Sequence, residues 1–142
     1  MSTRPIEQVD RFAAEFLRRY SLPLMRWSLV IVLVWSGLLA IAGMSSEMAL
    51  LAQAIGVPVG IGVVVLGVWE VVIGLGLIND RTVPIAVVLM IGYVAVTMVP
   101  LFVMPEVTFV DFPLTFSFEG AYILKNWALL GGVIMIGGLR SK

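Results

Sequence analysis

Four long apolar runs dominate the pattern of hydrophobic and polar positions along this chain. They cover residues 24–44, 56–78, 83–104 and 120–139. Each run is close to the ~20 residues that an α-helix needs to cross about 30 Å of hydrocarbon. Open strands are excluded as spanning elements, because they would leave backbone groups unpaired in lipid. The pattern predicts an all-α integral membrane protein with a four-helix transmembrane domain over residues 24–142.

The polar connections between the runs indicate how the helices are arranged. Residues 79–82 are so few that the second and third helices are predicted to be antiparallel neighbours in a compact four-helix bundle. The connection over residues 105–118 is longer, alternates apolar and polar residues, and is rich in phenylalanine. We expect this connection to lie against the membrane surface or to cap the bundle.

The segment before the first run, residues 1–23, has the periodicity of an amphipathic helix. Its apolar residues recur at helical spacing with charged residues on the opposite face: Ile6, Val9, Ala13, Phe16, Leu17 and Tyr20. Such a helix is typical of a segment that lies in the membrane interface, here on the cytoplasmic leaflet. A docking surface for a soluble partner is the alternative interpretation.

The positions of the basic residues predict the orientation in the membrane. The chain has nine lysine and arginine residues. Apart from Lys125, all of them precede the first run or lie at its start (Arg26), lie in residues 79–82 or follow the fourth run. In the other two connections all the charged residues are acidic, namely Glu47, Glu106, Asp111 and Glu119. Since basic loops stay in the cytoplasm, both termini are predicted to be cytoplasmic.

Composition narrows the possible functions. The chain is 61% hydrophobic and 13% charged, with zero net charge and no histidine or cysteine. A nucleic-acid binder would carry a basic surface, which is missing here. Disulfides, His- or Cys-ligated metals, His-ligated haem and dithiol relays are also excluded. We therefore expect no metal site, no intrinsic redox cofactor and no catalysis by the chain on its own.

Away from the span ends, where Arg26 stands, two ionisable side chains lie inside the predicted spans, Glu70 and Lys125. A charge near the bilayer centre costs ~2.5–3.5 kcal/mol on insertion scales, so both are expected to face the bundle interior or a cavity. Helical periodicity places each on a face with small or weakly polar residues. On the second helix, the face with Glu70 also carries Gly60, Gly67 and Gly74; on the fourth, the face with Lys125 carries Ala121, Ala128 and Gly132. Matching faces of the other two helices carry Ser36, Ala40 and Gly43 on the first, and Ala86, Met90, Tyr93, Thr97 and Pro100 on the third.

Depth along the helices groups the polar residues of these faces. At ~1.5 Å per residue, Glu70 and Tyr93 fall at similar levels near the midplane, with Thr97 and Lys125 about two turns further out. We predict a polar cluster of these residues with Ser36 nearby. In this cluster the acid and the amine neutralise each other directly or through water or a ligand. The cluster is either an ion pair that fixes helix register or a ligand or proton site.

Several short motifs in the spans resemble the DoxX-like membrane proteins. They are Arg26-Trp27-Ser28-Leu29, Val34-Trp35-Ser36-Gly37-Leu38-Leu39, Gly67-Val68-Trp69-Glu70-Val71-Val72-Ile73-Gly74 and Glu119-Gly120-Ala121-Tyr122-Ile123-Leu124-Lys125-Asn126. The resemblance implies a four-helix bacterial or archaeal inner-membrane protein. Its relatives include the DoxD-type subunit of a thiosulfate:quinone oxidoreductase. Glu70 and Lys125 match the family's membrane acid and helix-four lysine, whereas Ala40 stands where relatives often have a second lysine.

This resemblance and the polar cluster lead to one main functional hypothesis. The chain is expected to be an accessory or quinone-associated subunit of a membrane redox complex, with a bound quinone or lipid near Glu70 and Lys125. Its partner would be another membrane protein or a second copy of the chain. The alternatives are a small transporter or proton-linked carrier that uses the same two residues, and an assembly or stability factor without a ligand.

Overall fold

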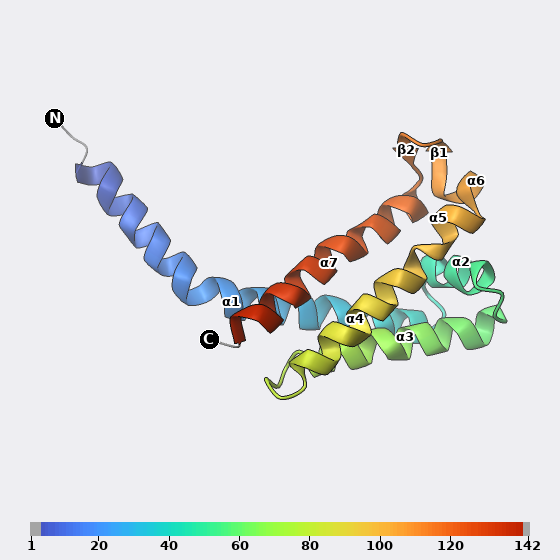
Figure 1. The fold of residues 1–142 in the computed structure, drawn as a ribbon, viewed down its shortest axis with the longest axis horizontal. Coiled ribbons are helices and arrows are strands. Elements are labelled where there is room, and N and C mark those ends of the chain that lie inside the picture. The colour runs from blue at the N-terminus through green and yellow to red at the C-terminus, as the bar shows by residue number, and fades with distance from the viewer. Residues whose placement is uncertain (1–3, 141–142) are drawn as a thin grey trace.

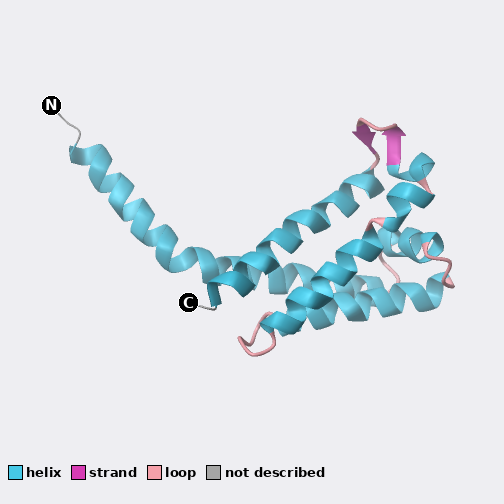
Figure 2. Ribbon diagram, viewed as in Figure 1, coloured by secondary structure: helices cyan, strands magenta, loops and turns pink. Residues whose placement is uncertain are grey.

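The described part of the protein consists mainly of helices joined by loops, with one small hairpin (Figures 1 and 2). The computed structural model describes residues 4–140. In chain order the elements are α1 (Arg4–Ile41), α2 (Ser46–Ala54), α3 (Val59–Gly76), α4 (Val83–Thr97), α5 (Val99–Val103), α6 (Pro105–Thr108), β1 (Phe109–Asp111), β2 (Thr115–Phe116) and α7 (Phe118–Arg140). The predicted helical architecture is therefore confirmed, with the antiparallel β1–β2 pair as an addition.

The described part of the chain contains four helical stretches that are long and apolar enough to cross a membrane. They are Ile6–Ile41, Val59–Gly76, Val83–Val103 and Phe118–Leu139, the third of which joins α4 and α5. The prediction of a multi-pass membrane protein is confirmed. The first two predicted runs extend a few residues beyond the helices. Gly43 and Gly56 both have a φ of 75°, a conformation that stops a helix and that glycine adopts without strain.

From Arg4 onward, the predicted amino-terminal segment is helical. It forms one continuous helix with the first span, and Pro23 lies inside α1. Proline removes one backbone hydrogen bond and bends a helix, but flanking residues can keep the helix going on both sides. Figure 1 shows α1 bending where it leaves the bundle, so that its amino-terminal part projects away from the other helices. Its apolar side chains are exposed, including Ile6 and Phe12 at 73% each.

The spanning helices pack in the order α1, α3, α4 and α7. α1 packs extensively on α3, α3 on α4, and α4 on α7, whereas α1 and α7 meet over a smaller area. The α3–α4 connection lies at one end of the bundle, here called the turn end, where Arg26 pairs with Asp80 at 2.6 Å. The opposite end carries α2, α6 and the hairpin and is called the hairpin end (Figure 1). α3 and α7 both run from the hairpin end to the turn end.

The closest helix contact joins α1 and α3 through two glycines. A methyl group added at Gly37 would stand 2.6 Å from the carbonyl oxygen of Gly67, and one added at Gly67 would stand 2.7 Å from the carbonyl oxygen of Gly37. Small residues at a membrane helix interface let the backbones approach in this way. The contact fixes the face of α3 that carries Glu70, one turn further along.

Two structured caps cover the hairpin end. The sequence did not predict α2, whose first turn is capped by the Ser45 hydroxyl accepting from the Met48 amide. Met48, Leu51 and Ala52 of α2 are buried. The second cap is α6 with the hairpin, in which the Thr108 side chain is fully buried. Residues 105–118 were expected either to lie against the membrane surface or to cap the bundle. The burial of Thr108 shows that α6, within this connection, caps the bundle.

Candidate functional site

Glu70 lies in the bundle interior with a carboxylate that has no hydrogen-bond partner among residues 4–140. Its side chain is 1% exposed. Neither carboxylate oxygen forms a hydrogen bond within residues 4–140. Helical side chains lean toward the amino-terminal end of their helix, and α3 begins at the hairpin end. The Glu70 side chain therefore leans toward the hairpin end. Its burial without a hydrogen bond has a free-energy cost.

Lys125 does not form a direct ion pair with Glu70. No ion pair between them within 4 Å is found among the described residues, where the Arg26–Asp80 pair is present. The Lys125 ammonium instead stands 3.7 Å from the centroid of the Tyr122 ring. Glu70 and Glu47 nevertheless both lie within electrostatic range of this ammonium. Of the two predicted arrangements, direct neutralisation is thus absent, and one mediated by water or a ligand stays open.

Helix direction explains why the acid and the amine do not meet. α7, like α3, begins at the hairpin end, so the lysine side chain leans away from the level of Glu70 and back over the preceding turn. Tyr122 occupies that preceding turn, three residues before Lys125. Two polar side chains on parallel helices therefore point the same way instead of toward each other.

The other three predicted site residues surround Glu70 to different degrees. Ser36 lies beside the carboxylate, but its hydroxyl donates to the Val32 carbonyl at 2.8 Å. Tyr93 is fully buried and lies within electrostatic range of Glu70. Thr97 is buried too, and its hydroxyl donates within α4 at 2.9 Å. The predicted buried face of the third helix is thus confirmed. The Thr97 hydroxyl is already hydrogen-bonded to a backbone carbonyl of α4.

The predicted face of the fourth helix needs correction. Ala121 and Ala128 are exposed and Lys125 is half-buried, whereas Ile123 and Asn126 are buried. The buried face is shifted because α7 packs mainly on α4 and separates from α1 toward the hairpin end. Asn126, not Lys125, is therefore the polar residue of α7 in the core, and its side-chain oxygen has no hydrogen-bond partner among the described residues.

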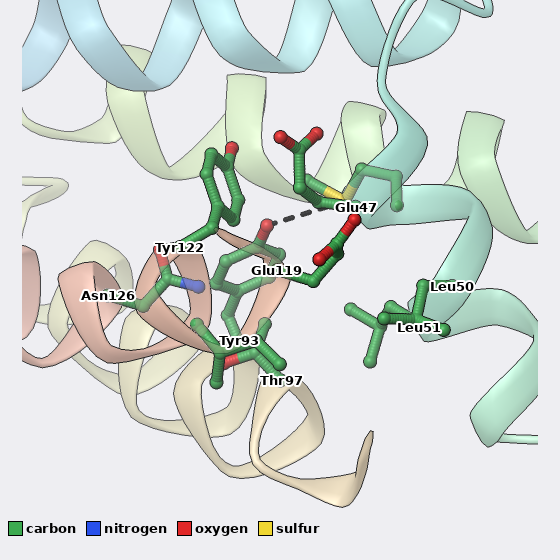
Figure 3. Close-up of a pocket in the computed structure, with 10 residues that line it drawn as sticks. Glu47, Leu50, Leu51, Tyr93, Thr97, Glu119, Tyr122 and Asn126 are labelled. Carbon is green, nitrogen blue, oxygen red and sulfur yellow. Dashed lines mark hydrogen bonds between the residues drawn. The ribbon is translucent and has the colours of Figure 1, made fainter. Parts of the chain in front are cut away.

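A small pocket between α2, α4 and α7 contains polar residues that the sequence did not single out. Besides Tyr93 and Thr97 it is lined by Glu47, Glu119, Tyr122 and Asn126. Figure 3 shows Asn126 pointing from α7 toward the Tyr93 ring, and the Glu47 and Glu119 carboxylates coming from α2 and α7 at the same pocket. The Tyr93 hydroxyl lies 3.6 Å from the sulfur of Met48, which is a weak acceptor.

A larger cleft of about 350 Å³ lies beside this pocket and shares Glu47 and Tyr122 with it. Its walls come from α1, α7 and the segment that leads into α2. The lining residues are Ile31, Val32, Trp35, Ser36, Leu39, Met44, Ser45, Glu47, Tyr122 and Lys125. Trp35 and Ile31 are each 64% exposed, so the cleft opens on the side of the bundle that would face lipid. It combines aromatic surface with one amine and one carboxylate.

In comparisons with known proteins, no family model, curated protein or solved structure matches this chain. The resemblance of the short motifs to DoxX-like proteins therefore stays a prediction. No group of three or more acidic side chains that could hold a metal ion is found among the described residues.

Proposed function

We propose that this chain is an accessory subunit of a membrane redox complex, resembling DoxX-like proteins, that holds a quinone in the cleft between α1 and α7. The observation that carries the proposal is the Lys125 ammonium, which lines a cleft open toward lipid and has no carboxylate within 4 Å among the described residues. An amine at the wall of a membrane cleft is a strong hydrogen-bond donor, and intramembrane ionisable residues mark functional sites by default.

The cleft suits the chemistry of a quinone. A quinone has a flat ring, carbonyl oxygens that accept hydrogen bonds and an apolar tail. Trp35 and Tyr122 provide aromatic surface against which the ring can pack, and the Lys125 ammonium can donate a hydrogen bond to a carbonyl oxygen. Ile31 and Val32 extend the cleft along α1 toward lipid, where the tail would lie. Ligand sites of this kind are mostly apolar with a few placed polar groups.

A partner must supply the electrons in this proposal. The chain has no cysteine or histidine, which are the usual ligands of haem, iron–sulfur and dithiol centres. A second membrane protein, or another subunit assembled with a homo-oligomer, would carry the redox centre. This chain would bind and position the quinone near it, in the cytoplasmic membrane of a bacterium or archaeon.

Quinone binding predicts that the ligand co-purifies with the chain. Protein extracted from bacterial membranes in mild detergent should carry ubiquinone or menaquinone, measured by solvent extraction and chromatography. Lys125→Met should lower the bound quinone at least fivefold, because the carbonyl oxygen loses its donor. Met135→Leu, on α7 but outside the cleft, is the matched control. Equal quinone in both variants, or none in the wild type, would contradict the proposal.

The proposal also includes an orientation, with both termini and the turn end in the cytoplasm. Because the chain lacks cysteine, single introduced cysteines report their side unambiguously. Ser46→Cys and Thr115→Cys, both exposed at the hairpin end, should react with a membrane-impermeant thiol reagent added to intact cells. Cysteines at Ser2 and Ser141, which lie outside the described residues, should react only after permeabilisation. Thr108 is unsuitable as a reporter because it is buried.

A proton-linked carrier is the second candidate, and one observation favours it. The Glu70 carboxylate is buried and unpartnered within residues 4–140, as expected for a group that binds and releases a proton during transport. Proton flux driven by a solute gradient across proteoliposomes would distinguish a carrier from a quinone subunit. An assembly factor would show neither flux nor bound quinone.

A further inference from the structure

The bundle interior is divided into a polar half and an apolar half at the level of Glu70. On the turn side of Glu70, the buried side chains are apolar on every spanning helix. They include Leu29 and Leu33 of α1, Ile73 of α3, Val83 and Met90 of α4, and Val133 and Ile136 of α7. With exposed fractions of 0–4%, they form a continuous core. A dry apolar core holds no ordered water, so it offers no route for a proton.

On the hairpin side of Glu70 the interior is polar. The buried polar side chains of residues 6–139 are Glu70 itself, Thr97, Thr108 and Asn126, and the last three lie on the hairpin side. The small pocket and the α1–α7 cleft are on this side too, and both reach Glu47 at the start of α2. A cavity with several polar groups can hold water that connects them.

Each helix packed around Glu70 presents one or more polar groups on this side. Ser36 faces it from α1, Tyr93 from α4, and Tyr122 and Lys125 from α7. Glu47 of α2 lies beyond them, within electrostatic range of Tyr122 and Lys125. Glu119 lines the pocket next to Glu47. Glu70 is the inner end of this series and Glu47 the outer end.

We infer that Glu70 is a proton-exchange site whose access is one-sided, from the hairpin end through the polar region bounded by Lys125, Tyr122 and Glu47. In the exchange, the protonated carboxyl releases a proton toward the cleft, by way of Ser36, which lies beside the carboxyl and lines the cleft, and becomes a carboxylate. The Lys125 ammonium stabilises the negative charge that remains, at a distance greater than that of an ion pair. No electron or second reactant takes part. With the orientation proposed above, the exchange occurs on the extracytoplasmic side.

The sidedness can be measured with a carbodiimide, which modifies carboxyl groups in their protonated form. Thr115→Cys protein is reconstituted into vesicles of phosphatidylcholine and phosphatidylglycerol. Vesicles with the hairpin end outward are captured through this cysteine. The pH is then changed on one side at a time, and mass spectrometry follows the loss of unmodified Glu70. Glu70→Gln, which has no carboxyl at this position, is the control for site assignment.

Raising the pH on the hairpin side should slow the modification of Glu70, because the protonated fraction of an acid falls about tenfold per pH unit above its pKa. The same change on the turn side should leave the rate within about twofold. Modification that follows the turn side, follows both sides, or does not occur on either side would overturn the inference. The measurement involves no quinone and no partner, so it can succeed or fail independently of the proposed redox function.

Discussion

Alanine at Gly67 should destabilise the bundle by about 1–3 kcal/mol, the usual cost of overpacking a well-packed interior. The added methyl group would stand 2.7 Å from the Gly37 carbonyl oxygen and 3.0 Å from the Ala40 methyl carbon. The first neighbour is backbone and cannot rotate away, so α1 and α3 must separate. Separation of these helices would also loosen the wall of the cleft on α1.

Unfolding of the purified protein in increasing concentrations of sodium dodecyl sulfate, followed by tryptophan fluorescence, measures this loss. Gly60→Ala is the matched control because it lies on the same helix and a methyl group there meets nothing within 4 Å. It should be neutral or slightly stabilising, since alanine favours a helix over glycine by roughly 0.5–1 kcal/mol. Equal losses in the two variants would show that α1 and α3 are not in the close contact described here.

Hydropathy was sufficient to predict the spanning helices but not the elements between them. A span is recognised by about 20 apolar residues, a signal that averages over many positions. The signals for α2 are few: Ser45 as the cap and Glu47 in the first turn of a nine-residue helix. The predicted segment ended at residue 23 because the apolar run begins at residue 24, and hydropathy alone does not show that one helix, α1, continues across that position.

The candidate site was predictable where helix packing is regular and was missed where two helices separate. Glu70 and Tyr93 were placed correctly in the interior, because α3 packs on both α1 and α4 and the helical period holds. On α7 the buried position is Asn126 and not Lys125, since the helix turns its buried face toward α4. Helical periodicity cannot predict which face of α7 is buried, because that face depends on which neighbouring helix α7 contacts.

Side-chain direction accounts for the remaining difference between sequence and structure. Depth counting brought Glu70 and Lys125 within reach of each other only if their side chains point in opposite directions along the bundle. The two helices run the same way, so both side chains lean toward the hairpin end. The amine therefore lines the cleft with Tyr122, and the carboxylate is left without a partner among the described residues.

Because of that missing partner, removal of the Glu70 carboxylate should make the bundle more stable. A buried polar group without a hydrogen bond costs about 1–3 kcal/mol, and methionine is an apolar side chain of similar size. Glu70→Met should therefore raise the unfolding free energy by roughly this amount. Glu70→Gln should gain less, because its amide still has to be buried with unpaired polar atoms.

The same detergent titration, carried out on two further variants, separates this explanation from a simple packing effect. Leu66→Met, another buried position on α3, is the matched control for introducing methionine and should change stability by less than about 1.5 kcal/mol. Lys125→Met combined with Glu70→Met should show less coupling than a direct ion pair would give, because the ammonium acts on the carboxylate from beyond the 4 Å of an ion pair. Destabilisation by Glu70→Met, or a large coupling with Lys125, would mean that the two charges neutralise each other after all. A gain in stability would instead identify Glu70 as a group that the bundle accommodates at a cost, as sites retained for activity often are.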